Sequence, residues 1–423
     1  FNHGRDIQRL QSPNPLRADV STGADCSRDS SERSQRLLSL EVQCSLGTIG
    51  DSLSDWVNLS YANVATTSPI AHQTSTEWSD SLARGGAAEF DGEAEKNGMM
   101  PLRRATARLL SCKVEDVCVG SSATELLCSV AWATSPPKGS NIVSTRASFP
   151  STVYPWIRVA DANGAEVRLA NHNSDFYTEP DDILSLIDED TSVVTVSHVE
   201  FSSGQRYDLR RFADAAHSVG AILVVDATQS MGMVPIDAPN SGADVIVSSG
   251  YKWLRGTYGA AVGYISPSVR PDMYPGLVGF RSHDDIWDLR AERMTLPEDA
   301  SRFEYTTIHF GAALGLAKAV DELCDFGTQE VWEHDIKLAD KVVEGANRLG
   351  LSIISPRSEG ERSAIVSLRM PDGISSEVIA RRLQDEHSIL VTSRAGLLRV
   401  SPHIDNTMEE VEMLFQALEC IFS

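Results

Sequence analysis

The chain has 423 residues, which is enough for two domains, and its 42% hydrophobic content is typical of a folded globular protein. Its formal net charge of −22 argues against a nucleic-acid partner and against docking on an anionic membrane, because both need clustered lysines and arginines. No apolar run approaches the roughly 18 residues of a membrane span, and the N-terminal stretch lacks the apolar segment of a secretory signal. The seven scattered cysteines include no C-x-x-C pair, so we expect reduced thiols and a cytoplasmic protein.

Three regions of the chain differ in composition and in hydrophobic periodicity. Residues 1–55 are polar, rich in Ser, Arg and Asp, and show little periodicity, which predicts a flexible N-terminal extension whose role the sequence leaves open. From about residue 100 helical and strand patterns alternate, which predicts an α/β domain over 56–310 with a mostly parallel sheet and helices on both faces. Longer helical patterns follow, and we expect a smaller α+β domain over 311–423.

The periodicity predicts individual elements in chain order. The stretch Leu209–Ser218 places Leu209, Phe212 and Ala216 on one helical face. Ala221–Val225 is apolar without alternation, as expected of a strand buried on both faces. Other helices are predicted at Pro101–Leu110, Thr124–Ala133, Gly311–Phe326, Val331–Leu349 and Met408–Phe422, and other strands at Val117–Val119, Asn141–Ser144, Val193–Ser197, Val245–Val247, Ala260–Ile265, Ile353–Ile354, Ala364–Leu368 and Leu397–Val400.

An acid and a lysine follow the ends of two predicted strands. Asp226 ends one strand and Lys252 comes shortly after the next, with Gln229 three residues beyond the acid. In an open parallel sheet, functional groups collect beyond the carboxyl ends of the strands, so Asp226 and Lys252 can meet in one cleft. This pair suits pyridoxal 5′-phosphate, which needs a lysine for its Schiff base and a carboxylate to keep its ring nitrogen protonated.

Other kinds of site find little support in the sequence. Gly256, Gly259 and Gly263 precede a strand and do not open a helix, so they do not form a nucleotide-binding loop. The ten histidines contain no H-E-x-x-H, and we expect no metal site. No G-x-S-x-G motif is present, which leaves no case for a serine hydrolase.

The segments VVDATQSMGMVPID and ADVIVSSGYKWLRGTYGAAVGYIS resemble the cofactor segment of class V aminotransferase-like enzymes. This fold-type-I pyridoxal phosphate group contains cysteine desulfurases, isopenicillin N epimerase and kynureninase. The resemblance runs from about Trp56 to the C-terminus. It implies that Lys252 is the Schiff-base lysine and Asp226 the partner of the pyridinium nitrogen. It also places Gln229 near the cofactor's phenolic oxygen and makes Ser249 and Tyr251 phosphate ligands.

Four other stretches extend the resemblance. GSSATELL resembles the loop and helix start beneath the phosphate, which implicates Ala123 and Thr124. In SFPSTVYPW, Phe149 matches the residue whose ring stacks on the cofactor. RFEYTTIHFGAALGL implies that Thr307 reaches the phosphate site of a neighbouring subunit, and thus a homodimer. Arg399, in LLRVSPHIDNT, matches the arginine that binds the substrate carboxylate, a role that suits the guanidinium fork.

The reaction itself is predicted only as a class. Cysteine desulfurases have a nucleophilic cysteine shortly before the carboxylate-binding arginine, but residues 393–398 contain no thiol. We therefore expect a lyase that acts on a small-molecule substrate, an α-amino acid of undetermined side chain, through a Lys252 aldimine and a quinonoid intermediate and expels a β-substituent by cleaving a C–S bond. Transamination and epimerisation begin with the same removal of the α-proton and remain alternatives, as does, more remotely, a non-catalytic scaffold with this fold.

Overall fold

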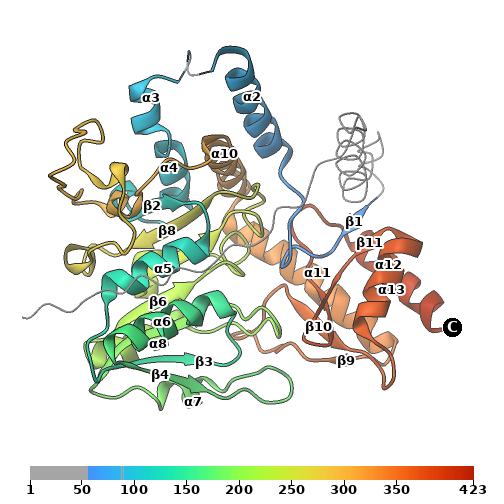
Figure 1. Cartoon of the computed structure of the whole chain (residues 1–423). Helices are drawn as coiled ribbons and strands as arrows, with labels where there is room; N and C mark the ends of the chain where they lie inside the picture. The colour runs from blue at the N-terminus through green and yellow to red at the C-terminus, as the bar shows by residue number, and fades with distance from the viewer. Residues whose placement is uncertain (1–55, 87, 89) are drawn as a thin grey trace, which may run out of the picture. The chain divides into compact units, whose positions relative to one another are not determined.

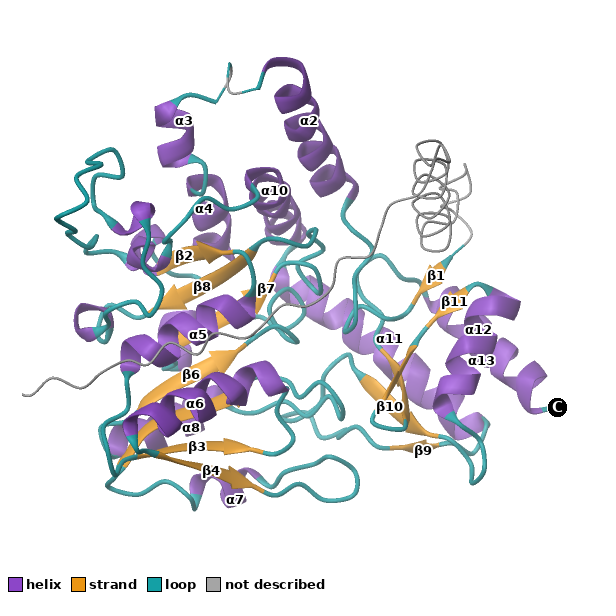
Figure 2. Ribbon diagram, viewed as in Figure 1, coloured by secondary structure: helices purple, strands orange, loops and turns teal. Residues whose placement is uncertain are grey.

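The computed structural model describes residues 56–86, 88 and 90–423, and residues 56–423 form one compact unit. The predicted flexible extension over 1–55 lies outside the described residues. The main sheet has seven strands in the order β2-β8-β7-β6-β5-β3-β4 (Figures 1 and 2). Its strands are β2 Val117–Gly120, β3 Asn141–Thr145, β4 Glu166–Ala170, β5 Thr191–Ser197, β6 Ile222–Asp226, β7 Val245–Ser249 and β8 Ala261–Ile265.

This sheet is mostly parallel, as predicted, but β8 runs against both of its neighbours. β4, β3, β5, β6 and β7 pair in parallel, whereas β8 pairs antiparallel with β7 and with β2. The prediction of a mostly parallel sheet is therefore confirmed, and β8 is the strand that departs from it. The reason is the connection over 250–260, which carries Lys252 and contains no helix. A parallel neighbour requires a crossover, usually a helix, and an antiparallel one does not.

Helices cover both faces of the main sheet, as the alternation of elements predicted. On β6, Leu223 and Val225 face a core shared with α4, α8 and α10, while Val224 faces a second core shared with α5 and α6. Because successive strand residues point to opposite faces, these two cores lie on opposite sides of the sheet. The helices of this part are α2 Pro69–Gly85, α3 Gly92–Asn97, α4 Met100–Leu109, α5 Ala123–Thr134, α6 Pro150–Asn163, α7 Pro180–Leu184, α8 Leu209–Ser218, α9 Ala238–Ser241 and α10 Phe310–Phe326.

The C-terminal part is built on a separate antiparallel sheet with the order β12-β13-β10-β9. Its own core includes Leu338, Leu398 and Phe415. β1 and β11 pair in parallel nearby, which joins the first described residues to this part. The division at residue 310 remains a prediction, and α10 contributes apolar side chains to the core of the main sheet. The elements are β1 Val57–Asn58, α11 Thr328–Arg348, β9 Ser352–Ile353, β10 Val366–Arg369, α12 Ser376–His387, β11 Ile389–Leu390, β12 Thr392–Arg394, β13 Leu397–Val400 and α13 Met408–Phe422.

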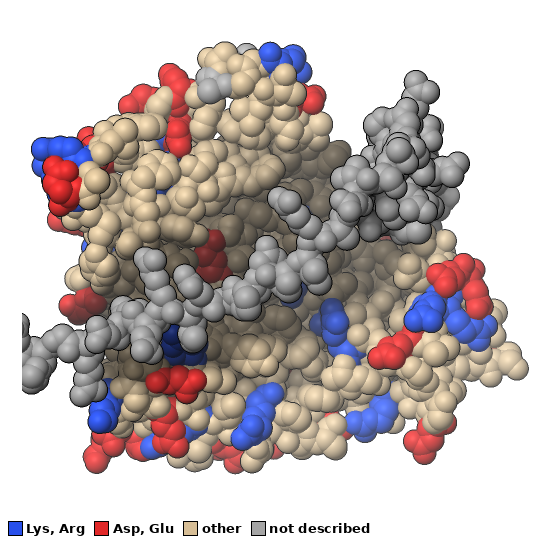
Figure 3. Space-filling model, in the orientation of Figure 1, with Lys and Arg blue, Asp and Glu red and all other residues tan. Residues whose placement is uncertain are grey.

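On the face drawn in Figure 3, basic and acidic side chains are interspersed around the edge. None of the helices within residues 56–423 has the length and apolar character needed to cross a membrane.

Candidate active site

A pocket lies at the carboxyl ends of β6 and β7, where the sheet topology brings Asp226 and Lys252 together. Asp226 is the last residue of β6, Lys252 follows the end of β7 by three residues, and the two strands are parallel neighbours. The open space in the pocket is about 420 Å³, within the range of small-molecule sites. Its lining contains eight of the ten predicted site residues, Ala123, Thr124, Phe149, Asp226, Gln229, Ser249, Tyr251 and Lys252, together with Ser151, Ser197, Val199, Phe201 and Thr228.

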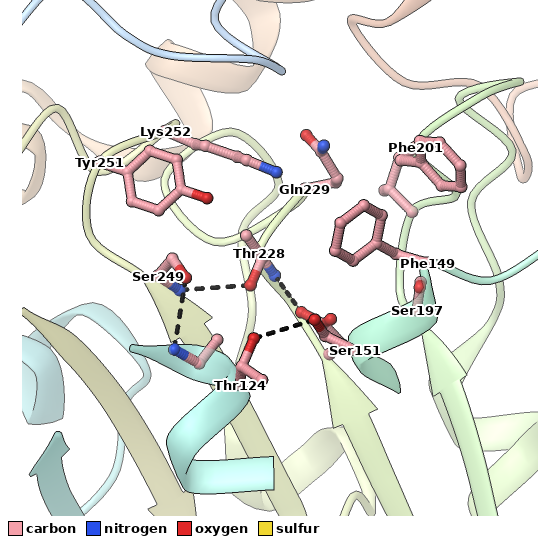
Figure 4. A pocket seen from close by; sticks show the side chains of 13 residues that line it. Thr124, Phe149, Ser151, Ser197, Phe201, Thr228, Gln229, Ser249, Tyr251 and Lys252 are labelled. Atoms are coloured by element: carbon pink, nitrogen blue, oxygen red, sulfur yellow. Dashed lines mark hydrogen bonds between the residues drawn. The ribbon is translucent and has the colours of Figure 1, made fainter. Parts of the chain in front are cut away.

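The amine of Lys252 is prepared for reaction by its surroundings. Burial, followed by the positive charge of Arg399, lowers the pKa of Lys252 to about 8 against the opposing effect of Asp226. The Nζ atom lies 5.8 Å from the ring centres of both Phe149 and Tyr251 (Figure 4). A lysine that loses its proton near neutral pH is a competent nucleophile and base.

Asp226 is fixed by two hydrogen bonds at the base of the pocket. Thr152 Oγ1 donates to Oδ2 at 2.9 Å, and the backbone N–H of Thr228 donates to Oδ1 at 3.0 Å. A second carboxyl, Glu200, is fully buried and accepts a 2.8 Å hydrogen bond from Ser148. Burial raises the pKa of Glu200 to about 8, with a smaller contribution from the charge of Asp226. Glu200 is therefore largely neutral at pH 7, so it competes little with Asp226 for a cation.

The start of α5 forms a cradle that suits a phosphate. The backbone N–H of Ala123 lies 3.4 Å from Ser249 Oγ, and Ser249 N–H donates to Thr228 Oγ1 at 3.2 Å (Figure 4). Thr124 Oγ1 donates to Ser151 Oγ at 2.9 Å. The first N–H groups of a helix have no intrahelical acceptor and favour an anion, and four hydroxyls lie near them here.

Two aromatic rings border the space between this cradle and Lys252. The side chain of Phe149 is 43% exposed, although it lines the pocket, and it meets Phe201 edge to face at 5.3 Å. Tyr251 stacks on Tyr258 with 4.4 Å between ring centres. An apolar ring left uncovered inside a pocket suits the face of a planar ligand. Pyridoxal phosphate thus fits the residues present, with a lysine, an acid, an anion cradle and an aromatic platform around one space.

The orientation of the Gln229 amide follows from its partners. The indole N–H of Trp253, which can only donate, lies 3.0 Å from Gln229 Oε1. Gln229 Nε2 donates to the carbonyl of Ala62 at 2.9 Å. One N–H of Gln229 therefore remains for an acceptor outside these contacts, which suits the predicted place beside a phenolic oxygen.

Arg399, on β13, does not line the pocket itself but lies behind Phe201, which does. Its Nη1 donates to the carbonyl of Phe201 at 2.7 Å. The side chain is 1% exposed, and Nε and Nη2 have no hydrogen-bond partner among the described residues. Burial, followed by the charge of Arg394, lowers the pKa of Arg399 to about 9. A buried cation with two unused donors has the chemistry of a carboxylate site.

Thr307 is the one predicted residue that lies apart from the others. It is exposed, is absent from the pocket lining, and donates from Oγ1 to Glu95 at 3.3 Å.

Several residues of the site were not predicted from the sequence. Thr152, Thr228 and Ser151 hold or flank predicted residues, and the place of Thr228 just after the end of β6 was a usable signal. Trp253 follows Lys252 in the recognised motif, but its bond to Gln229 spans 24 residues and leaves no local pattern. Glu200, three residues beyond the end of β5, was not predicted either.

The parallel sheet, the buried lysine facing an acid across a pocket, and the anion cradle define an enzyme of the pyridoxal phosphate-dependent, fold-type-I class. The chain belongs to the class-V aminotransferase family, whose model matches residues 61–414. This confirms the predicted family, fold and cofactor.

Curated proteins and solved structures agree with this assignment. A probable cysteine desulfurase of Pyrococcus abyssi is 27% identical over 75% of this chain and 81% of its own length. The apo cysteine desulfurase of Thermococcus onnurineus matches with a TM-score of 0.78 at 24% identity, covering 87% of this chain and 95% of that one. The cystine C-S lyase C-DES, solved with its reaction product cysteine persulfide, matches with a TM-score of 0.79 at 19% identity, covering 86% and 98%. These structures show the same fold.

Proposed function

We propose that this enzyme is a C–S lyase that acts on an α-amino acid. The observation that carries the proposal is the buried amine of Lys252 in the pocket that Asp226 lines, close enough to Arg399 for the charge of this arginine, which has two unused donors, to act on it. Relatives named as cysteine desulfurases and a structural neighbour named as a C-S lyase support sulfur chemistry.

Each role in the site rests on the contacts described above. Lys252 would be the attachment point of the cofactor, Asp226 would bind its ring nitrogen, and Ala123, Thr124, Ser249 and Tyr251 would hold its phosphate. Phe149 would pack against the ring, and Gln229 would donate its remaining N–H to the phenolic oxygen. When bound, pyridoxal phosphate supplies a conjugated ring that withdraws electrons from the α-carbon of the substrate.

The protein's own groups then act on the substrate. Arg399 binds the α-carboxylate through Nε and Nη2, which fixes the α-carbon relative to Lys252. The Lys252 amine, once free, removes the α-proton as a general base, a role that its pKa of about 8 suits. The electron pair of the former Cα–H bond forms a Cα–Cβ double bond while the Cβ–S bond breaks, and the pair of the Cβ–S bond leaves with sulfur.

The absence of a pocket thiol supports a lyase over a persulfide-forming enzyme. No cysteine lines the described pocket, and the β12–β13 hairpin contains none. Sulfur therefore leaves with the product and is not transferred to the protein.

The decisive experiment incubates the purified holoenzyme with S-substituted cysteines. A lyase releases one thiol, one pyruvate and one ammonia per substrate. Alanine with sulfur bound to the protein, or exchange of the amine with a 2-oxo acid, would contradict the proposal and indicate a desulfurase or a transaminase.

We also propose that the enzyme is a cytoplasmic homodimer in which Thr307 completes the partner's phosphate site. Support comes from the exposure of Thr307 away from the pocket of its own chain. Exposed Tyr258, Tyr274 and Trp287 offer apolar contact area. The five described cysteines are free thiols, which suits a reducing compartment.

A further inference from the structure

Two arginines share one face of the β12–β13 hairpin. Thr392 lies opposite Arg399 in the antiparallel register, and Arg394 lies opposite Leu397. Because alternate residues of a strand point to the same side, Arg394 and Arg399 are diagonal neighbours on one face. The backbone positions of such neighbours are about 7–8 Å apart, within reach of long side chains.

Arg394 is directed towards the segment that packs on the Lys252 loop. Its Nη2 donates to Asn63 Oδ1 at 2.8 Å. Asn63 directly follows Ala62, whose carbonyl accepts from the pocket residue Gln229. Two residues further on, the N–H of Ala65 donates to the carbonyl of Tyr251. The guanidinium of Arg394 is thus anchored beside the pocket, although its side chain remains exposed.

The charge of Arg394 has no anionic partner among the residues that the structure describes. Its polar contact, Asn63, is a neutral amide. Its positive charge contributes to the lowered pKa values of both Arg399 and Lys252. Three cationic side chains therefore act on one region, where the nearby carboxyl groups are those of Asp226 and of the largely neutral Glu200.

We propose that Arg394 binds a second anionic group, carried on the side chain of the substrate, while Arg399 binds the α-carboxylate. The substrate class is then an α-amino acid with an acidic side chain. This inference rests on the proposed function, and within it the substrate is a cysteine whose sulfur substituent carries a carboxylate. A guanidinium anchored by a neutral amide keeps further donors for such a group.

The test compares two ligands of nearly equal size with the holoenzyme, S-carboxymethyl-L-cysteine and its neutral amide S-carbamoylmethyl-L-cysteine. Dissociation constants are measured from the change in visible absorbance on binding. We expect the acid to bind about tenfold more tightly than the amide, the size of one charge-assisted hydrogen bond. The preference should shrink as salt rises, because Arg394 is exposed.

The variant Arg394→Gln should abolish this preference and leave the affinity for the amide nearly unchanged. Arg381→Gln is the matched control, because Arg381 is an exposed arginine on α12 and its loss changes the net charge equally. Equal binding of the acid and the amide by the wild-type enzyme would overturn the inference, as would an equal preference in both variants. If the preference holds but no pyruvate is released, the C–S lyase proposal fails and the acidic subsite stands.

Discussion

At the residue scale, the reactivity of Lys252 depends on two neighbours of opposite sign. Arg399 lowers its pKa and Asp226 raises it, while burial contributes the largest shift. An ordinary lysine, with a pKa near 10.4, would be almost wholly protonated at pH 7.

This leads to a prediction about pH. The rate at which the apoenzyme attaches pyridoxal phosphate should rise with pH and level off above about 8, because the neutral amine is the nucleophile. Stopped-flow absorbance across pH 6 to 10 measures it. Arg399→Gln removes a cation, so the midpoint should move to higher pH. A rate that still climbs steeply above pH 9 in the wild type would show that the amine is not perturbed.

A second prediction concerns the covalent link. Lys252→Ala should lack the chromophore that borohydride reduces, since no other amine is expected to replace it, and should form no product. Lys337→Ala, which removes an exposed lysine on α11, should keep both the chromophore and activity. Mass spectrometry after reduction identifies the modified residue. A reduced adduct on Lys252→Ala would contradict the assignment.

At the element scale, the Lys252 loop is held by close backbone packing. Gly232 has φ +100°, and a Cβ at this position would lie 2.4 Å from the carbonyl oxygen of Trp253. His403 Nε2 lies 3.0 Å from that same oxygen, and Asp335 lies 2.7 Å from His403 Nδ1, with both side chains fully buried. The carbonyl can only accept, so His403 must donate to it.

We therefore expect Gly232→Ala to be strongly destabilising. Backbone strain at positive φ costs about 1–2 kcal/mol, and overpacking against Trp253 adds about 1–3 kcal/mol. Gly220→Ala is the control, because Gly220 has φ +79° but nothing within 4 Å of its Cβ position, so only the strain applies. Denaturant unfolding compares the two variants. Equal losses of stability in the two variants would show that the backbone at Trp253 shifts at little cost to make room for the added methyl group.

The helices and strands that the sequence predicted are those with clear hydrophobic periodicity and with residues that mark where the element begins and ends. The bounds of α8 and α13 agree with prediction, and most other bounds differ by a few residues. Helix α6 was missed, because Pro155 removes a helical hydrogen bond and obscures the pattern, while burial of Trp156 and Val159 stabilises the helix nonetheless. Helix α12 was also missed, although the cap at Ser375 was a signal for it.

The site residues that could be predicted are those that lie in the family segments, including those around Asp226 and Lys252. Residues next to Asp226 and Lys252 in the chain were found because strand ends and family segments mark them. The bond from Arg394 to Asn63 spans 331 residues, and that from Arg399 to Phe201 spans 198, so neither leaves a local pattern. Such contacts depend on how the small sheet packs against the pocket.

At the scale of the whole molecule, the proposed dimer makes a prediction about mixed subunits. Thr307→Val should weaken retention of pyridoxal phosphate, and Lys252→Ala should be inactive. Unfolding and refolding the two variants together should yield hybrid dimers in which one of the two sites has both native residues. Activity should therefore exceed that of either variant alone. Sedimentation of a monomer, or no gain on mixing, would contradict a shared site.

The first described segment of the chain, which contains the short strand β1, links the C-terminal part to the loop of the main domain that carries Lys252. Val57 and Asn58 pair with β11, and a few residues later Ala62 and Ala65 hydrogen-bond to Gln229 and Tyr251. A ligand that draws Arg394 and Arg399 towards the pocket would also stabilise these hydrogen bonds of Ala62 and Ala65. The deuterium uptake of the Ala65 amide should therefore slow when substrate binds. Hydrogen exchange at this one amide would then report on substrate binding at the arginines of the β12–β13 hairpin.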